Sequence, residues 1–185
     1  MEYEKIAGPL RNPHVLGHSL HVFFTAYSLL AALPEGVLTR QQERDLLAAA
    51  LLHDIGKAVW PQDWHEKPLY QLGATALTVM RAHPIQGANT LLEAGIPPEV
   101  ARLVKQHHER PGGKGYPLGV DPPFDSVLLA ACDVFCACLE KRPYKQKECT
   151  LEEALRAVAK FAPGQVVKAL ATALAKGRGM AAPGY

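Results

Sequence analysis

The sequence predicts a mainly α-helical protein of the all-α fold class. Apolar residues recur at spacings of three and four along almost the whole chain, and no stretch alternates strictly enough, for long enough, to be a strand. Helix-start signals such as Asn12-Pro13, Thr39 and Pro97-Pro98 divide this pattern into segments. Since 185 residues suit one compact unit, we expect a single domain over residues 1–185.

The first half of the chain is expected to hold two long helices. Asn12-Pro13 begins the first, over residues 14–33, and Pro34 lies just beyond its end. Thr39 begins the second as an N-cap, with Gln42 completing a capping box, and this helix reaches the vicinity of His53 before Gly56 ends it. Residues 59–72 mix prolines, tryptophans and polar residues, so they predict an irregular connection.

In the second half, His83-Pro84 is expected to separate two short helices, over 74–82 and 84–94, because proline suits a first helical turn. Pro97-Pro98 begins another helix that ends near His108. Four glycines and four prolines within residues 110–123 then predict a loop. Three further helices are expected over 124–141, 151–161 and 164–175, followed by a frayed tail over 177–185.

Composition and charge narrow the class of protein. Hydrophobic residues make up 48% and charged residues 21%, which is typical of a globular protein with a core. A net charge of +2 gives no support for nucleic-acid binding, and no apolar stretch is long enough to cross a bilayer. The start of the chain lacks a secretory pattern, and the four cysteines crowd into residues 132–149 as buried, reduced thiols would. We therefore expect a soluble cytoplasmic protein.

The adjacent pair His53-Asp54 is the sharpest chemical signal. It follows an apolar helical run and precedes Ile55-Gly56-Lys57. Burying an imidazole and a carboxylate side by side is unfavourable without a partner, and a metal cation is such a partner. Lys57, three residues after the carboxylate, is placed to reach a phosphate oxygen as a point charge.

Other metal-ligating side chains fall on separate predicted segments. Asp133 stands out, because a carboxylate within an apolar helix should be paired or metal-bound. Taken singly, each of these residues is more often an ordinary surface or hydrogen-bonded group. Together they supply two carboxylates and up to five imidazoles, the inventory of a two-metal site. The set is His18, His53, Asp54, His83, His107, His108 and Asp133.

With these residues in place, the chain resembles the HD superfamily of metal-dependent phosphohydrolases, and within it the HD-GYP type, over about residues 14–161. The resemblance implies an HD-domain helical bundle with irregular connecting loops. It rests on His18-Ser19, His53-Asp54-Ile55-Gly56-Lys57, Lys67-Pro68, His83-Pro84-Ile85-Gln86-Gly87, His107-His108-Glu109-Arg110, Gly113-Lys114-Gly115-Tyr116-Pro117, Asp133 and Arg142-Pro143-Tyr144.

The resemblance also implies roles for these residues. Asp54 would bridge two divalent transition-metal ions, usually iron or manganese, with zinc, cobalt or nickel as alternatives. The first ion would be held by His18, His53 and Asp133, and the second by His83, His107 and His108. Asp54 and Lys57 would be the catalytic residues. The substrate, a small nucleotide such as cyclic di-GMP, would meet Lys57, Lys114, Gly115, Tyr116, Pro117 and Arg142.

Several positions depart from the family pattern. Gly112 stands where the loop usually has Asp, Gln62 replaces an Asp after Pro61, and Cys136 begins an altered stretch that ends at Glu140. His14 occupies the place where some relatives have a Glu that recruits a third metal, so a third ion is not expected. These departures leave the residues of the two-metal core unchanged but bear on the substrate.

Three functions therefore compete. The first is hydrolysis of a cyclic dinucleotide, and the second is hydrolysis of another nucleotide or phosphate ester by a stand-alone enzyme of this superfamily. The third is a catalytically silent module that binds a cyclic dinucleotide or a partner protein. Near the site, Trp60, Trp64 and Tyr70 suit either nucleobase stacking or a hydrophobic lid, and His21 is expected to hydrogen-bond within the core.

Overall fold

The computed structural model describes residues 4–61, 64–65, 67–68, 71–141 and 149–177. These residues form helices and loops without a strand, which confirms the all-α prediction. The α-helices are α1 (Glu4–Leu10), α2 (Pro13–Leu30), α3 (Arg40–Leu52), α5 (Ala74–Glu93), α6 (Pro98–Gln106), α7 (Phe124–Leu139), α8 (Leu151–Ala159) and α9 (Gly164–Gly177), with the 3-10 turns η1 (Ile55–Lys57) and η3 (Pro111–Gly113).

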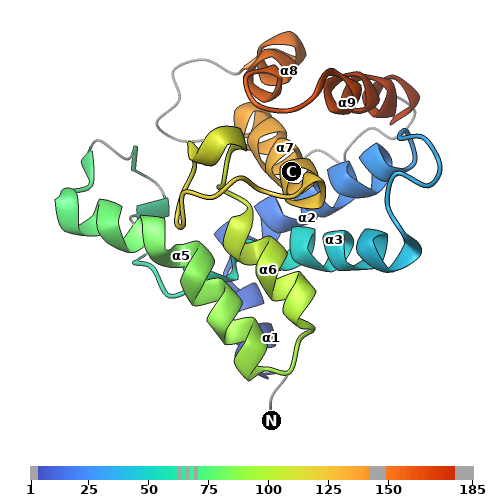
Figure 1. Ribbon diagram of the computed structural model, residues 1–185. Helices are drawn as coiled ribbons and strands as arrows, with labels where there is room; N and C mark the ends of the chain where they lie inside the picture. The colour runs from blue at the N-terminus through green and yellow to red at the C-terminus, as the bar shows by residue number, and fades with distance from the viewer. Residues whose placement is uncertain (1–3, 62–63, 66, 69–70, 142–148, 178–185) are drawn as a thin grey trace.

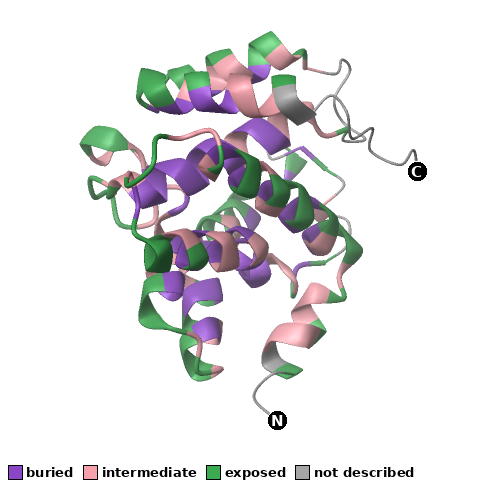
Figure 2. Cartoon of the chain, turned by 90° about the vertical axis from the view of Figure 1, so that its right-hand side faces the viewer, coloured by how far each residue is buried: buried purple, intermediate pink, exposed green. Residues whose placement is uncertain are grey.

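Helix α7 runs through the middle of the bundle and is the most apolar of its elements. It packs against α2 and α3 on one side and α8 on another. Helix α6 packs against both α3 and α5 (Figure 1). Phe135, Leu128 and Leu129 on α7 are almost completely buried in the shared core. Buried residues gather on the facing sides of the helices and exposed residues on the outer sides (Figure 2). Burial of these apolar faces is the main stabilising contribution to the fold.

The predicted helix starts at the N-terminal half are confirmed. Asn12 caps α2 by accepting a hydrogen bond from the His14 backbone N–H at 3.0 Å. Thr39 and Gln42 form the capping box of α3. The Gln42 nitrogen donates to Thr39 Oγ1 at 3.2 Å, and the Thr39 nitrogen donates to Gln42 Oε1 at 2.9 Å. Each cap satisfies backbone donors that the first helical turn leaves without partners.

The predicted break at His83-Pro84 is wrong, because α5 is one continuous helix across Pro84. A proline inside a helix removes the N–H that would bond to the carbonyl four residues earlier, here that of Met80. The side chain of His83 replaces the missing donor, since its Nδ1 lies 2.6 Å from the Met80 oxygen. The helix therefore continues, and its histidine is held in one orientation.

Other boundaries shift less. Helix α1 was not predicted. Its seven residues include Gly8-Pro9, a dipeptide that is typical of turns rather than helices. Helix α7 ends at Leu139 rather than at residue 141, and η3 lies inside the predicted loop 110–123. No helix in the described ranges has the length and apolar character needed to cross a membrane. Of the tail predicted to fray, residues 178–185 lie outside the described residues.

Candidate metal centre

The carboxylate of Asp54 lies at the centre of the predicted site and is almost completely buried. It follows His53, the C-cap of α3, and precedes η1. Its oxygen Oδ2 is 3.5 Å from His53 Nε2 and 3.9 Å from His18 Nε2. Its oxygen Oδ1 is 3.3 Å from His83 Nε2 and 3.8 Å from His107 Nε2. The two oxygens thus face two different sets of imidazoles.

The first set consists of residues from α2 and from the end of α3. His18, His53 and Asp54 each offer one ligand atom, and these atoms lie within 4.8 Å of one another. Asp133 on α7 borders this group, with Oδ1 at 3.0 Å from His18 Nε2 and 3.9 Å from His53 Nε2. Three helices distant in sequence therefore bring two carboxylates and two imidazoles together, and we name these four residues the first group.

The second group consists of His83, His107 and His108, whose ligand atoms also lie within 4.8 Å of one another. His83 comes from α5, while His107 and His108 follow the last turn of α6. The Nδ1 atom of His108 is 3.8 Å from Asp133 Oδ2, so Asp133 also faces both groups. The structure thus brings together all seven residues that the sequence predicts as metal ligands.

Three of the histidines are oriented by the same interaction, a hydrogen bond to a backbone carbonyl three residues earlier. The Nδ1 atoms of His53, His83 and His107 lie 2.9, 2.6 and 2.6 Å from the carbonyl oxygens of Ala50, Met80 and Val104. Two of these carbonyls belong to last helical turns and the third faces Pro84, so the regular helical pattern supplies no backbone donor to them. A carbonyl only accepts, so Nδ1 carries the hydrogen and Nε2 presents its lone pair to the centre.

The donor atoms fit divalent cations. His53 Nε2 and Asp54 Oδ1 are buried and make no hydrogen bond within the described part of the chain. His83 Nε2 and His107 Nε2 lie 3.2 Å apart, although both are acceptors when Nδ1 holds the hydrogen. Leaving buried acceptors without donors costs about 1–3 kcal/mol each, and a shared cation removes that penalty. Mixed imidazole and carboxylate ligation suits first-row transition metals.

Electrostatics supports the same assignment for most of the imidazoles. Burial lowers the pKa of His53 and His83 and holds those of His107 and His108 well below the ordinary range, so these rings are neutral, as metal ligation requires. Burial also lowers the pKa of His18, but hydrogen bonds with Asp133 and Glu140 outweigh it and raise that pKa to about 9. An ion at the first group would therefore displace a proton from His18.

The carboxylates of the centre are ionised. Burial alone raises their pKa, but the Lys57 ammonium holds the pKa of Asp54 well below its usual range. Burial is likewise outweighed at Asp133, where a hydrogen bond with His18 lowers the pKa. Lys57 Nζ lies 2.7 Å from Asp54 Oδ2, so Lys57 enters the centre as a partner of Asp54. Its ammonium is also 5.8 Å from the centroid of the Trp60 ring.

The loop after His108 closes one side of the centre. Gly115 has no room for a side chain, since a Cβ there would lie 2.4 Å from the His108 carbonyl oxygen. The Tyr116 N–H donates to the same oxygen at 3.2 Å, and the Tyr116 ring stacks on that of His108 with centroids 4.6 Å apart. Glu109 is buried and accepts N–H bonds from Leu118 and Val120 at 2.6 and 3.2 Å, which holds the loop down.

The remaining predicted substrate residues are spread more widely. Pro117 follows Tyr116 and is half-buried. Lys114 is exposed and lines a separate hollow of about 560 Å³ with Arg110, Val134 and Phe161, none of which belongs to the two groups. Arg142, Gln62 and Tyr70 lie outside the described residues.

The departures from the family pattern have local explanations. Gly112 has a φ of +73°, a backbone region that favours glycine, and its N–H donates to Asp121 Oδ1 at 3.0 Å. Cys136 is buried, with Sγ 3.2 Å from Thr25 Oγ1. The His14 ring stacks on His65 at 5.1 Å and belongs to neither group.

Two residues near the centre were missed by sequence reasoning. Glu140 lies 2.7 Å from His18 Nδ1, and Arg81 on α5 places its guanidinium carbon 5.6 Å from the Tyr116 ring centroid. Glu140 had a usable signal, because it follows Asp133 by seven residues and two helical turns return to the same face. His21 was expected to hydrogen-bond in the core, but its side chain is 66% exposed and also reaches Glu140.

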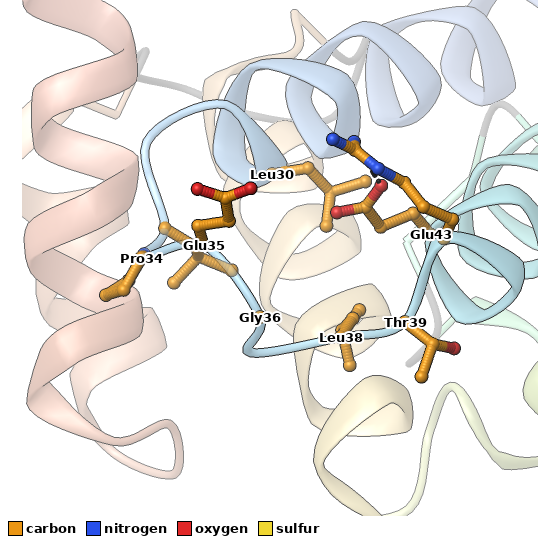
Figure 3. A pocket seen from close by; sticks show the side chains of 9 residues that line it. Leu30, Pro34, Glu35, Gly36, Leu38, Thr39 and Glu43 are labelled. Carbon is orange, nitrogen blue, oxygen red and sulfur yellow. Dashed lines mark hydrogen bonds and ion pairs between the residues drawn. The ribbon is translucent and has the colours of Figure 1, made fainter.

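Another hollow, of about 410 Å³, lies at the connection between α2 and α3 (Figure 3). Its walls include Leu30, Leu38, Arg40 and Glu43, and it shares no residue with either group of ligands. This hollow is therefore separate from the two groups of candidate ligands.

Comparison with known proteins agrees with the geometry. The model of the HD domain family matches residues 10–163. This chain belongs to the HD domain family. A cyclic di-GMP phosphodiesterase of Pseudomonas aeruginosa is 38% identical to it over 122 residues, which is 64% of this chain and 29% of that protein. A 3'3'-cGAMP-specific phosphodiesterase of Vibrio cholerae is 32% identical over 113 residues, or 58% of this chain and 26% of that protein.

A solved structure has the same fold. The HD domain of the phosphodiesterase PgpH from L. monocytogenes, in complex with cyclic-di-AMP, gives a TM-score of 0.70 at 17% identity. That likeness covers 100% of this chain and 99% of the other. The present chain spans less than a third of the length of the phosphodiesterases from P. aeruginosa and V. cholerae.

Proposed function

We propose that this HD domain is a metal-dependent phosphohydrolase of the HD-GYP type that hydrolyses a phosphodiester bond of cyclic di-GMP or a related cyclic dinucleotide. The proposal rests on Asp54, whose Oδ1 and Oδ2 face separate groups of imidazoles. A carboxylate can ligate two cations, whereas an imidazole nitrogen ligates one, so only such a residue can join the groups. The substrate class is that of the similar proteins from P. aeruginosa and V. cholerae.

The two groups would hold two divalent transition-metal ions, with iron or manganese as first choice and zinc, cobalt or nickel as alternatives. His18, His53 and Asp133 would complete the first site, and His83, His107 and His108 the second. Bound there, such ions would activate water for in-line attack and neutralise charge on the phosphoryl oxygens.

The chain's own side chains orient and bind the substrate. Lys57 is paired with Asp54 at 2.7 Å, and its flexible ammonium can turn to a phosphate oxygen. Gly115 lets the backbone approach the His108 carbonyl, and Tyr116 holds the His108 ring, so this loop and Pro117 form the wall beside the substrate. Lys114 and Arg142 remain predicted contacts with outer parts of the substrate.

A second substrate class is favoured by one observation. Gly112 stands where the family pattern has Asp, so a carboxylate is missing from the loop beside the substrate, where the Gly112 N–H donates to Asp121. Another nucleotide or a simple phosphate ester is therefore the alternative to a cyclic dinucleotide. A silent binding module is the third reading.

Turnover of a substrate panel separates these functions. The protein is purified without air, loaded with manganese or iron, and supplied with cyclic di-GMP, 3'3'-cGAMP, cyclic-di-AMP and nucleoside phosphates. Hydrolysis confined to cyclic dinucleotides supports the proposal, and hydrolysis of other esters supports the second class. Tight binding of a cyclic dinucleotide without turnover, in protein with both sites filled, would contradict the enzymatic function.

The cytoplasm is the proposed location. Cys132 and Cys136 are buried in α7, as suits thiols in a reducing compartment. Small-molecule nucleotides, rather than nucleic acids or membranes, are the proposed partners.

A further inference from the structure

His18 differs from the other oriented histidines of the centre in its place in the chain. His53 and His107 are C-caps and His83 precedes a proline, so each finds a carbonyl without a backbone donor. His18 lies inside α2 (Pro13–Leu30), where the preceding carbonyls accept hydrogen bonds from the helix itself. The local backbone therefore offers no acceptor for its Nδ1, and an acceptor must come from elsewhere in the fold.

Glu140 supplies that acceptor. It is the C-cap of α7, with extended backbone angles of φ −66° and ψ 135° that turn the chain away from the helix. Its Oε1 lies 2.7 Å from His18 Nδ1, while His18 Nε2 faces Asp133 Oδ1 at 3.0 Å. Only 18% of the Glu140 side chain is exposed, so solvent screens the contact weakly.

We propose that Glu140 is a positioning residue for the first metal site: by accepting the Nδ1 hydrogen it turns His18 so that the Nε2 lone pair points at the ion. This inference rests on the proposed function, because it assumes that the first group holds a metal. A carboxylate partner also makes the imidazole a stronger electron donor than a carbonyl partner does. The first site thus gains negative charge that the second site, with its three imidazoles, lacks.

The altered stretch of α7 strengthens the assignment. Glu140 closes the segment from Cys136 in which this chain departs from the family pattern, so the contact is a feature of this sequence. His21, one turn after His18, places its Nδ1 3.2 Å from the same oxygen. Because His21 is exposed and belongs to neither group, it offers a matched control for loss of a Glu140 partner.

The test is a double-mutant cycle of Glu140 and His18 in which the measured quantity is the affinity for metal. Ion-free native protein and the variants Glu140→Ala, Glu140→Gln and His21→Ala are titrated with Mn²⁺ in a calorimeter, after circular dichroism has shown that they fold. In Glu140→Ala we expect the affinity for one of two ions to fall by about 10–100-fold and that for the other to stay within about twofold. Glu140→Gln, which keeps an acceptor but not the charge, should fall in between, and His21→Ala should match the native protein.

The second arm repeats Glu140→Ala in a His18→Ala background. If Glu140 acts through His18, its removal there should change the affinity by less than about twofold, since interacting residues are not additive. Equal losses in both backgrounds, or native affinities in Glu140→Ala, would overturn the inference. Native protein that binds two ions without turnover contradicts the proposed function alone, whereas native protein that binds none contradicts both.

Discussion

Replacing Gly56 with alanine should damage the fold and the metal centre together. A Cβ at this position would lie 2.2 Å from the His83 carbonyl oxygen and 2.9 Å from the Gly87 nitrogen, both of them backbone atoms of α5. Ordinary van der Waals contact begins near 3.4 Å. Relief therefore requires η1 and α5 to separate by about 1 Å, because neither obstacle is a flexible side chain.

The magnitude follows from that displacement. Overpacking of a close contact costs about 1–3 kcal/mol, and a protein of this size loses roughly 2–4 °C in melting temperature per kcal/mol. Ion-free Gly56→Ala should thus melt roughly 2–12 °C below the native protein. A shift of about 1 Å at His83 should also lower turnover by about 100-fold, as misplacement of catalytic groups does.

Gly17 provides the matched control, because it is exposed within α2 and nothing lies within 4 Å of an added Cβ. Gly17→Ala should raise stability by about 0.5–1 kcal/mol, since alanine favours a helix interior more than glycine does. Melting is followed by circular dichroism in chelator. If Gly56→Ala melts within a degree of native protein and binds metal normally, the close approach of η1 to α5 is not a structural requirement.

Three further outcomes are expected. Asp54→Ala should abolish hydrolysis and lower bound metal measured by elemental analysis, and activity near native would exclude a bridging role. Lys57→Ala should keep its metal while losing rate; metal that falls in step with activity would show that Lys57 does not act on phosphate. In chelated protein, His18, with its pKa raised from 6.5 to about 9, adds stability that is complete below pH 6.5 and lost as pH rises toward 9. The buried histidines with lowered pKa oppose folding below pH 6.5, so melting temperature should peak near that pH; a steady rise to pH 9 would contradict this assignment.

Local sequence signals predicted the helix starts well and one helix interior poorly. The capping box of Thr39 and the cap at Asn12 depend on residues within three positions, so they can be read directly from the chain. Pro84 could not be judged in that way. Its effect on α5 depends on the His83 side chain replacing the lost backbone donor at the Met80 carbonyl, and sequence pattern alone does not predict that rotamer.

The candidate site shows the same division. The candidate ligands could be picked out, because imidazoles and carboxylates form a recognisable order along the chain. Their separation into two groups could be expected only from the resemblance to the HD-GYP type, since the residue pattern alone does not say which oxygen of Asp54 faces which helix. Lys114 was predicted to meet the substrate from its place in a motif, yet its side chain lines a hollow away from both groups.

The two metal groups also differ in what holds their ligands. In the second group, His83 and His107 are oriented by backbone carbonyls, which remain when neighbouring side chains are substituted. In the first group, His18 is oriented through the side chain of Glu140, more than one hundred positions away in the sequence. A single substitution can therefore remove the support of His18 but not that of His107. We infer that the first site is the one at which sequence change within this fold can most readily alter metal affinity, while the second site persists as long as Pro84 inside α5 and the C-terminal end of α6 are kept.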